Sequence, residues 1–119
     1  QIAICGSLSG YIGLPNSQPY ASTKAGLINL AETLRVDLYK KVDIKLISPG
    51  FVSTRLTKKN SFEMPGLMTP EEAAVVIRKG LDSKKFEIHF PKQLSLTLKF
   101  ISLMPYLLSN LILRKMNIK

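Results

Sequence analysis

Apolar and polar positions follow two different rhythms along the chain, and these predict strands and helices in turn. Residues 1–6 are a short apolar run that ends at Gly6, which is typical of a strand buried on both faces in a parallel sheet. From about Tyr20 to Tyr39 apolar residues recur at helical spacing, which predicts a helix with one buried face. That face consists of Leu27, Ala31, Leu34 and Leu38.

The pattern continues with a second strand, a second helix and a third strand. The segment "VDIKLISPG" at residues 42–50 predicts a strand that a Pro-Gly pair stops, and residues 85–91 alternate apolar and polar positions as a strand does. Between them the segment "TPEE" at residues 69–72 predicts a helix start, because its threonine can cap the helix and its last glutamate completes a capping box. This order of elements predicts an α/β fold with a parallel sheet and helical crossovers.

Residues 93–119 predict an apolar helical tail that follows a domain of residues 1–92. Pro105 should kink or split the tail helix, because proline lacks the backbone N–H donor that a helix needs. Three roles stay open for the tail: lying on a membrane surface, covering a substrate pocket or subunit interface, or spanning a membrane. Its apolar positions at helical spacing are Leu96, Phe100, Leu103, Leu107 and Leu111.

The charge of the chain is concentrated in this tail. The formal net charge is +9, and residues 91–119 hold five Lys or Arg residues and no acid. Such cations beside an apolar helix can reach anionic lipid headgroups. We expect no nucleic-acid partner, because the chain has neither clustered arginines with interleaved aromatics nor a recognised reader motif. The five cations are Lys92, Lys99, Arg114, Lys115 and Lys119.

The single cysteine and the single histidine favour structural roles. Cys5 cannot form an internal disulfide, which favours a reducing compartment, and its apolar neighbours predict a small buried hydrophobic residue. His89 lies in the third predicted strand without other ligand residues around it, so no metal site is expected.

The candidate chemistry involves three residues near the first strand. Tyr20 and Lys24 are four positions apart at the start of a helix, so they lie on one helix face. Ser7 follows the end of the first strand, and ligand crevices in open parallel sheets lie at the carboxyl ends of the strands. A Tyr-x-x-x-Lys pair is weak evidence by itself in a lysine-rich chain, but its position in the predicted fold strengthens it.

The pattern "S-x(12)-Y-x-x-x-K", followed by "PGFVST" at residues 49–54, resembles the short-chain dehydrogenase/reductase family. The resemblance covers residues 1 to about 90 and implies the C-terminal half of a doubly wound, Rossmann-like sheet that binds NAD or NADP. It implies that Tyr20 is the general acid in carbonyl reduction and the base in alcohol oxidation. Lys24 would favour the phenolate and bind the nicotinamide ribose. Ser7 would donate a hydrogen bond to the substrate oxygen.

The resemblance also assigns the turn after the second strand to cofactor binding. Pro49 and Gly50 would let the backbone approach the nicotinamide, since Gly50 has no Cβ. Val52, through its backbone, and Thr54, through its hydroxyl, would meet the carboxamide. Residues 55–68 would form a substrate lid, and their apolar side chains suggest a lipophilic alcohol or ketone. These side chains are Phe62, Met64, Leu67 and Met68.

Two features of the family are missing from the sequence: the glycine-rich turn that holds the pyrophosphate and the asparagine of the proton relay. The chain begins at Gln1 inside a predicted strand, so we expect a truncated enzyme that is inactive as this piece and homo-oligomeric when complete. We expect a cytoplasmic protein, free or peripheral at the inner face of a membrane. The alternative is a non-catalytic NAD(P)-binding protein or sensor, which would not need the intact Ser7, Tyr20 and Lys24.

Overall fold

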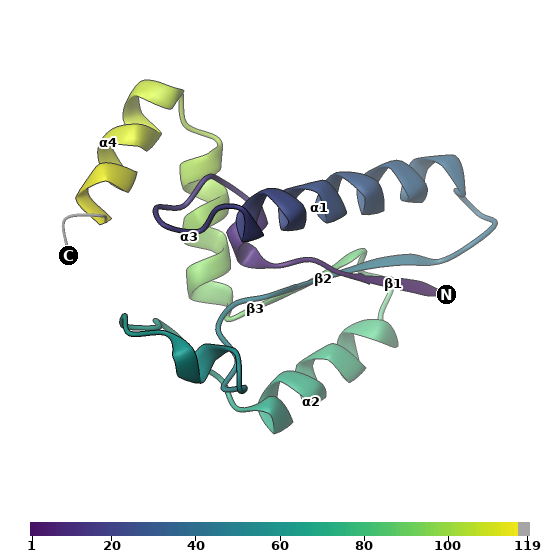
Figure 1. Cartoon of the computed structure of the whole chain (residues 1–119). Helices are drawn as coiled ribbons and strands as arrows, with labels where there is room; N and C mark the ends of the chain where they lie inside the picture. Colours follow the sequence, from purple (N-terminus) through teal and green to yellow (C-terminus); the bar gives the residue numbers. More distant parts are fainter. Residues whose placement is uncertain (117–119) are drawn as a thin grey trace.

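The computed structural model describes residues 1–116 and contains a sheet of three parallel strands. The elements of the sheet and its crossovers are β1 (Ile2–Cys5), α1 (Tyr20–Asp37), β2 (Ile44–Pro49), α2 (Pro70–Leu81) and β3 (Glu87–Phe90). Strand β2 lies between β1 and β3, and helices α1 and α2 cover opposite faces of the sheet (Figure 1). The Rossmann-like α/β arrangement expected from the sequence is confirmed.

Strand β1 differs from the prediction because it is not buried on both faces. It pairs with β2 alone in the described part of the chain, with Ile2 opposite Ile44 and Cys5 opposite Ile47. As the edge strand it leaves Ile2 44% exposed, and Cys5 is also exposed. The prediction that Cys5 is a buried hydrophobic residue was therefore wrong, since an apolar run indicates a strand without giving its place in the sheet.

The crossover helices show the buried face predicted for α1 and the start predicted for α2. In α1, Ala31 is fully buried, and the other predicted face positions are partly buried. Helix α2 begins with the expected capping box: the Thr69 hydroxyl accepts a hydrogen bond from the Glu72 N–H at 3.2 Å, and Glu72 accepts from the Thr69 N–H at 2.9 Å. Helix α2 packs on β3, where Ile88 is buried and contributes roughly 1.5–3 kcal/mol.

A buried lysine stands in the central strand. Lys45 is 1% exposed, and its ammonium nitrogen donates hydrogen bonds to the carbonyl oxygens of Ser83 and Lys85. The Asp43 carboxylate lies 3.6 Å from the same nitrogen. These oxygens satisfy the buried charge and tie β2 to the turn before β3.

The tail forms two short helices, α3 (Lys92–Ser102) and α4 (Tyr106–Met116), which confirms the break at Pro105. Each has 11 residues and is therefore about 16 Å long, whereas the hydrocarbon core of a bilayer is about 30 Å thick. Within residues 1–116 no helix combines the length and hydropathy that crossing a membrane requires. Lys119, one of the five tail cations, lies outside the described residues.

Candidate active site

Ser7 stands at the carboxyl end of β1 and begins a short 3-10 helix, η1 (Leu8–Gly10). Its backbone is extended and its side chain caps η1 by accepting a hydrogen bond from the Ser9 N–H at 3.2 Å. The Ser9 hydroxyl also donates to the Ser7 oxygen, at 2.9 Å. The buried Ser7 hydroxyl is therefore held in one place by Ser9, a residue that the sequence analysis did not single out.

The ends of β1 and β2 meet at one edge of the sheet. The Ser7 hydroxyl lies 3.5 Å from the carbonyl oxygen of Pro49, toward which it donates. The Gly6 N–H donates to the Ile47 carbonyl at 2.7 Å, and the Gly50 N–H donates to the Phe90 carbonyl at the same distance. The structure thus brings Ser7 and the turn after Pro49 together, as the topology of a parallel sheet requires.

Tyr20 and Lys24 lie on the first turns of α1, next to this edge. The Lys24 ammonium donates a hydrogen bond to the Cys5 carbonyl at 3.1 Å and lies 5.5 Å from the centre of the Tyr20 ring. Tyr20 is 55% exposed, so its phenol is open to a bound molecule. A cation this close to a phenol ring interacts with it electrostatically.

Gly10 lets η1 press against α1 at the level of Lys24. A Cβ at position 10 would lie 2.8 Å from the carbonyl carbon of Lys24 and 2.9 Å from the backbone nitrogen of Ala25. It would also lie 2.7 Å from the side chain of Ile28. The close approach of the Ser7 segment to α1 therefore depends on Gly10. The pattern of Ser7, Tyr20 and Lys24 in the sequence does not indicate this role.

Gly50 has a packing role within the chain. A Cβ there would lie 2.8 Å from the Pro91 ring and 3.2 Å from the Leu8 side chain. The missing Cβ was expected to let a nicotinamide ring approach, whereas the packing of Pro91 and Leu8 against Gly50 by itself leaves no room for a Cβ. The approach of a ring stays a prediction.

The segment from Val52 to Thr54 is held by contacts with Met68 and with the Thr57 hydroxyl. Val52 forms an isolated parallel β-bridge with Met68, and the Ser53 N–H donates to the Met68 carbonyl at 2.8 Å. The Thr57 hydroxyl accepts from the Thr54 N–H and donates to the Val52 carbonyl, each at 2.7 Å. Thr57 is the first residue of the 3-10 helix η2 (Thr57–Lys59). Its hydrogen bonds and those of Met68 join the two ends of the predicted lid, residues 55–68.

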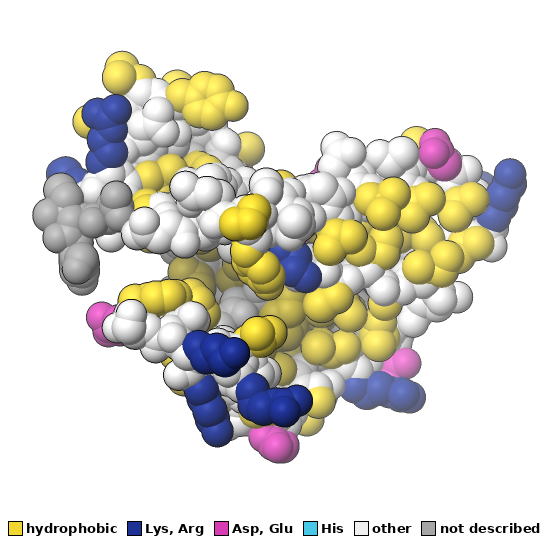
Figure 2. All heavy atoms as spheres, viewed as in Figure 1, with side chains coloured by type: hydrophobic (Ala, Val, Ile, Leu, Met, Phe, Trp, Pro, Cys, Tyr) yellow, Lys and Arg dark blue, Asp and Glu magenta, His cyan; other side chains and the backbone are white. Residues whose placement is uncertain are grey.

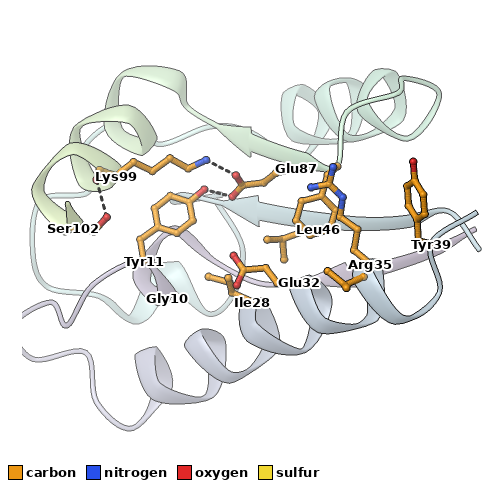
Figure 3. A pocket seen from close by; sticks show the side chains of 12 residues that line it. Gly10, Tyr11, Ile28, Glu32, Arg35, Tyr39, Leu46, Glu87, Lys99 and Ser102 are labelled. Carbon is orange, nitrogen blue, oxygen red and sulfur yellow. Dashed lines mark hydrogen bonds and ion pairs between the residues drawn. The ribbon is translucent and has the colours of Figure 1, made fainter.

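A second polar cluster joins β3 to the tail and was missed by the sequence analysis. Tyr11 and Lys99 both point at the carboxylate of Glu87 and donate hydrogen bonds to it (Figure 3). The buried Ser48 hydroxyl donates to the same carboxylate at 2.9 Å. The cluster borders a cavity of about 720 Å³ whose lining includes none of Ser7, Tyr20 and Lys24.

The cluster shifts the acidity of its members in opposite directions. Burial opposes the ionisation of Glu87, but the hydrogen bonds from Lys99, Tyr11 and Ser48 together hold its pKa below the ordinary value of 4.5. Burial, and then the hydrogen bond to Glu87, raises the pKa of Tyr11 above its ordinary value of 10.0. Glu87 is thus a charged acceptor and Tyr11 a neutral donor near neutral pH.

His89 belongs to a local hydrogen-bonded group. Its Nδ1 lies 2.6 Å from the Ser95 hydroxyl, and its Nε2 lies 3.0 Å from the Lys92 ammonium. Burial, followed by repulsion from Lys99 and Lys92, lowers the pKa of His89. These contacts fit a structural role, and residues 1–116 contain no group of three or more His, Cys, Asp and Glu side chains that could hold a metal ion.

Comparison with known protein families settles the relationship that this geometry suggests. The family model described as short chain dehydrogenase matches residues 1–64, which is just over half of the 119 residues. The chain belongs to the short-chain dehydrogenase family. The match includes Ser7, Tyr20, Lys24 and the whole turn from Pro49 to Thr54.

Relatives of this short-chain dehydrogenase chain carry several oxidoreductase names. An uncharacterised oxidoreductase of Myxococcus xanthus is 38% identical over 100 residues, covering 83% of this chain and 40% of the relative. An 11-beta-hydroxysteroid dehydrogenase A of Arachis hypogaea is 31% identical over 49% of the chain and 17% of its own length. A 3-oxoacyl-acyl-carrier-protein reductase of Buchnera aphidicola is 36% identical over 49% and 24%. The chain thus spans less than half the length of each.

Proposed function

We propose that this chain carries the catalytic half of an oxidoreductase that interconverts an alcohol and a ketone or aldehyde with NAD or NADP. The observation that carries the proposal is the position of the Lys24 ammonium, 5.5 Å from the Tyr20 ring centre and bonded to the Cys5 carbonyl two residues before Ser7. A phenol, an ammonium group and a hydroxyl near the carboxyl edge of a parallel sheet, where such folds bind their ligands, support a proton-transfer site there.

The chemistry of the site follows from what each side chain can do. In the reducing direction the Tyr20 hydroxyl gives its proton to the oxygen of the carbonyl substrate, and in the oxidising direction the phenolate takes it back. The Ser7 hydroxyl donates a hydrogen bond to the substrate oxygen, where negative charge develops during reduction. The nicotinamide, when bound, supplies or accepts the hydride.

The residues present suit the nicotinamide end of such a cofactor. An ammonium group has three donors, and Lys24 uses one of them on Cys5, so donors remain for a ribose hydroxyl. Pro49, Gly50, Val52 and Thr54 follow β2 at the same edge and are proposed to contact the nicotinamide. The preference between NAD and NADP belongs to parts of the family fold that these 119 residues do not include.

The substrate is proposed to be lipophilic. Leu56, Phe62 and Leu67 of the proposed lid are exposed large apolar side chains, and Phe62 packs its edge on Phe51 with ring centres 5.8 Å apart. Relatives named for hydroxysteroids and for 3-oxoacyl groups support the same class. An apolar lid can order over an apolar ligand and exclude water from the reaction.

We also propose a domain organisation, an oligomeric state and a location for the protein. The share of the relatives that the chain covers supports a longer enzyme in which residues 1–92 belong to the catalytic domain and residues 93–119 form a tail. We propose a homo-oligomer in the cytoplasm that is peripheral at the inner face of a membrane.

Turnover and cofactor binding test the proposal separately. The protein is expressed from the longest natural reading frame that contains this chain, and oxidation of NADH and NADPH is followed with a panel of ketones that includes steroids and 3-oxoacyl esters. The proposal predicts binding and turnover with at least one lipophilic ketone. Cofactor binding without turnover in either direction would instead identify a non-catalytic NAD(P)-binding protein.

A further inference from the structure

We propose that helices α3 and α4 bind the surface of an anionic lipid bilayer through one exposed apolar ridge. The proposal rests on the peripheral location proposed above and names the surface and the lipid chemistry. We call this surface the α3–α4 ridge. It consists of Leu96, Phe100, Leu103, Tyr106, Leu107 and Leu111.

The ridge contains the two most exposed large apolar side chains of the described residues, Tyr106 and Leu103. Leu103, Tyr106 and Leu107 are 85%, 87% and 76% exposed, and they surround the turn that joins the two helices. Figure 2 shows apolar side chains at the upper tip, where α3 and α4 meet, with Lys or Arg side chains beside them along α4. An exposed apolar surface of this kind is typical of a binding site.

Both helices have a separate packed face, so the ridge is not needed for their folding. In α3, Leu98 and Ile101 are buried, whereas Leu96, Phe100 and Leu103 follow the opposite stripe at i, i+4 and i+7. In α4, Leu113 is buried together with Ser109. Each helix thus packs on the rest of the protein through one face and exposes a second apolar stripe to solvent.

The charge of α4 fits an anionic lipid surface. Its exposed stripe runs from Leu107 through Leu111 to Lys115 at i, i+4 and i+8, with Arg114 beside it. Residues 91–119 include no Asp or Glu that would repel a phosphate or carboxylate headgroup. A helix lying flat on a bilayer could bury Leu107 and Leu111 while the two cations meet headgroups.

The other tail cations contribute less. Lys99 turns inward to pair with Glu87. Lys92 lies against His89, and partial burial lowers its pKa. Lys92, expected from the sequence to reach headgroups, is exposed but has its ammonium at the His89 ring, whereas Arg114 and Lys115 are exposed together at the end of α4. The lipid contact should therefore depend on α4 more than on the start of α3.

Vesicle flotation tests the ridge without requiring turnover. The protein from the longest natural reading frame is mixed with vesicles of phosphatidylcholine, with or without phosphatidylserine. The wild-type protein should float with the phosphatidylserine vesicles. Leu107→Glu with Leu111→Glu should lower the bound fraction at least tenfold on both vesicles. Arg114→Glu with Lys115→Glu should remove the preference for phosphatidylserine, with about a fivefold loss for each cation.

Val75→Glu is the matched control, because Val75 is an exposed apolar residue on α2, away from the ridge. It should float like the wild type, and circular dichroism should show that all variants are folded. Wild-type protein that stays unbound, or a ridge variant that floats like the wild type, would overturn the proposal. If the ridge variant splits an oligomer while the wild type does not float, the ridge is a subunit interface and the lipid proposal fails. Loss of flotation with turnover intact would leave the proposed function standing.

Discussion

The Lys24 ammonium of α1 donates a hydrogen bond at 3.1 Å to the carbonyl oxygen of Cys5, the last residue of β1. This bond joins two residues that lie 19 positions apart in the sequence and fixes the cation at the edge of the sheet. Tyr20 precedes Lys24 by one helical turn, and Ser7 follows Cys5 by two residues. The position of the three proposed catalytic residues therefore depends on how α1 sits against the end of β1.

Gly10→Ala should disturb this contact between η1 and α1. The new methyl group would meet the backbone of Lys24 and Ala25 at under 3 Å, so either η1 or the start of α1 must shift. We expect a loss of roughly 1–3 kcal/mol in the free energy of unfolding and a lower kcat with the substrate found in the activity screen. Gly13→Ala is the control, because a Cβ there meets nothing within 4 Å. Equal effects of the two variants would contradict the close packing at Gly10.

Two helix glycines should respond oppositely to alanine. A Cβ at Gly80 of α2 would lie 2.5–2.7 Å from three carbons of Ile88, whereas a Cβ at Gly26 of α1 meets nothing within 4 Å. Gly80→Ala should therefore destabilise the protein by about 1–3 kcal/mol despite its better helix propensity. Gly26→Ala should stabilise it by up to about 1 kcal/mol. Urea unfolding of both variants measures the difference, and a stabilising Gly80→Ala would show that α2 does not press on β3.

Glu87→Gln should destabilise the protein more than the loss of an exposed ion pair. The carboxylate accepts hydrogen bonds from Tyr11, Ser48 and Lys99, so its neutralisation should cost roughly 1–3 kcal/mol. Asp82→Asn, which removes the exposed partner of Arg78, should cost at most about 0.5 kcal/mol. Chemical denaturation at neutral pH compares the two, and a cost of Glu87→Gln no larger than that of Asp82→Asn would argue against a cohesive cluster.

The same cluster predicts a loss of stability in acid. The pKa of Glu87 is lower in the folded protein than its ordinary value of 4.5. Its contribution is therefore complete above that ordinary value and disappears as the pH falls through the lower folded pKa. The wild-type free energy of unfolding should fall below about pH 4.5 more steeply than that of Glu87→Gln. Parallel curves for the two proteins would mean that Glu87 does not contribute to the pH dependence.

The sequence predicts the order of the elements well, because each signal is local. The capping box at Thr69 and Glu72, the split at Pro105 and the buried face around Ala31 all depend on residues within a few positions of one another. The short-chain dehydrogenase motif likewise predicts which residues meet at the carboxyl edge, since parallel strands end on the same side.

The parts that the sequence does not reveal depend on distant residues. Tyr11 and Glu87 are 76 positions apart, and the two carbonyl acceptors of Lys45 lie about 40 positions away from it, so no periodicity marks these contacts. The exposure of Cys5 follows from the place of β1 at the edge of the sheet, which strand patterns do not encode. Local patterns therefore indicate elements and motifs, whereas partner choice requires the folded structure.

Tyr20→Phe tests the proton-transfer site most directly. The change removes one hydroxyl and keeps the ring beside Lys24. In the protein from the longest natural reading frame, we expect turnover of the best ketone to fall at least about a hundredfold, with NAD(P)H binding retained. Tyr39→Phe, at an exposed tyrosine just beyond the other end of α1, should retain turnover. Wild-type turnover by Tyr20→Phe would contradict the assignment of Tyr20 as the acid and base.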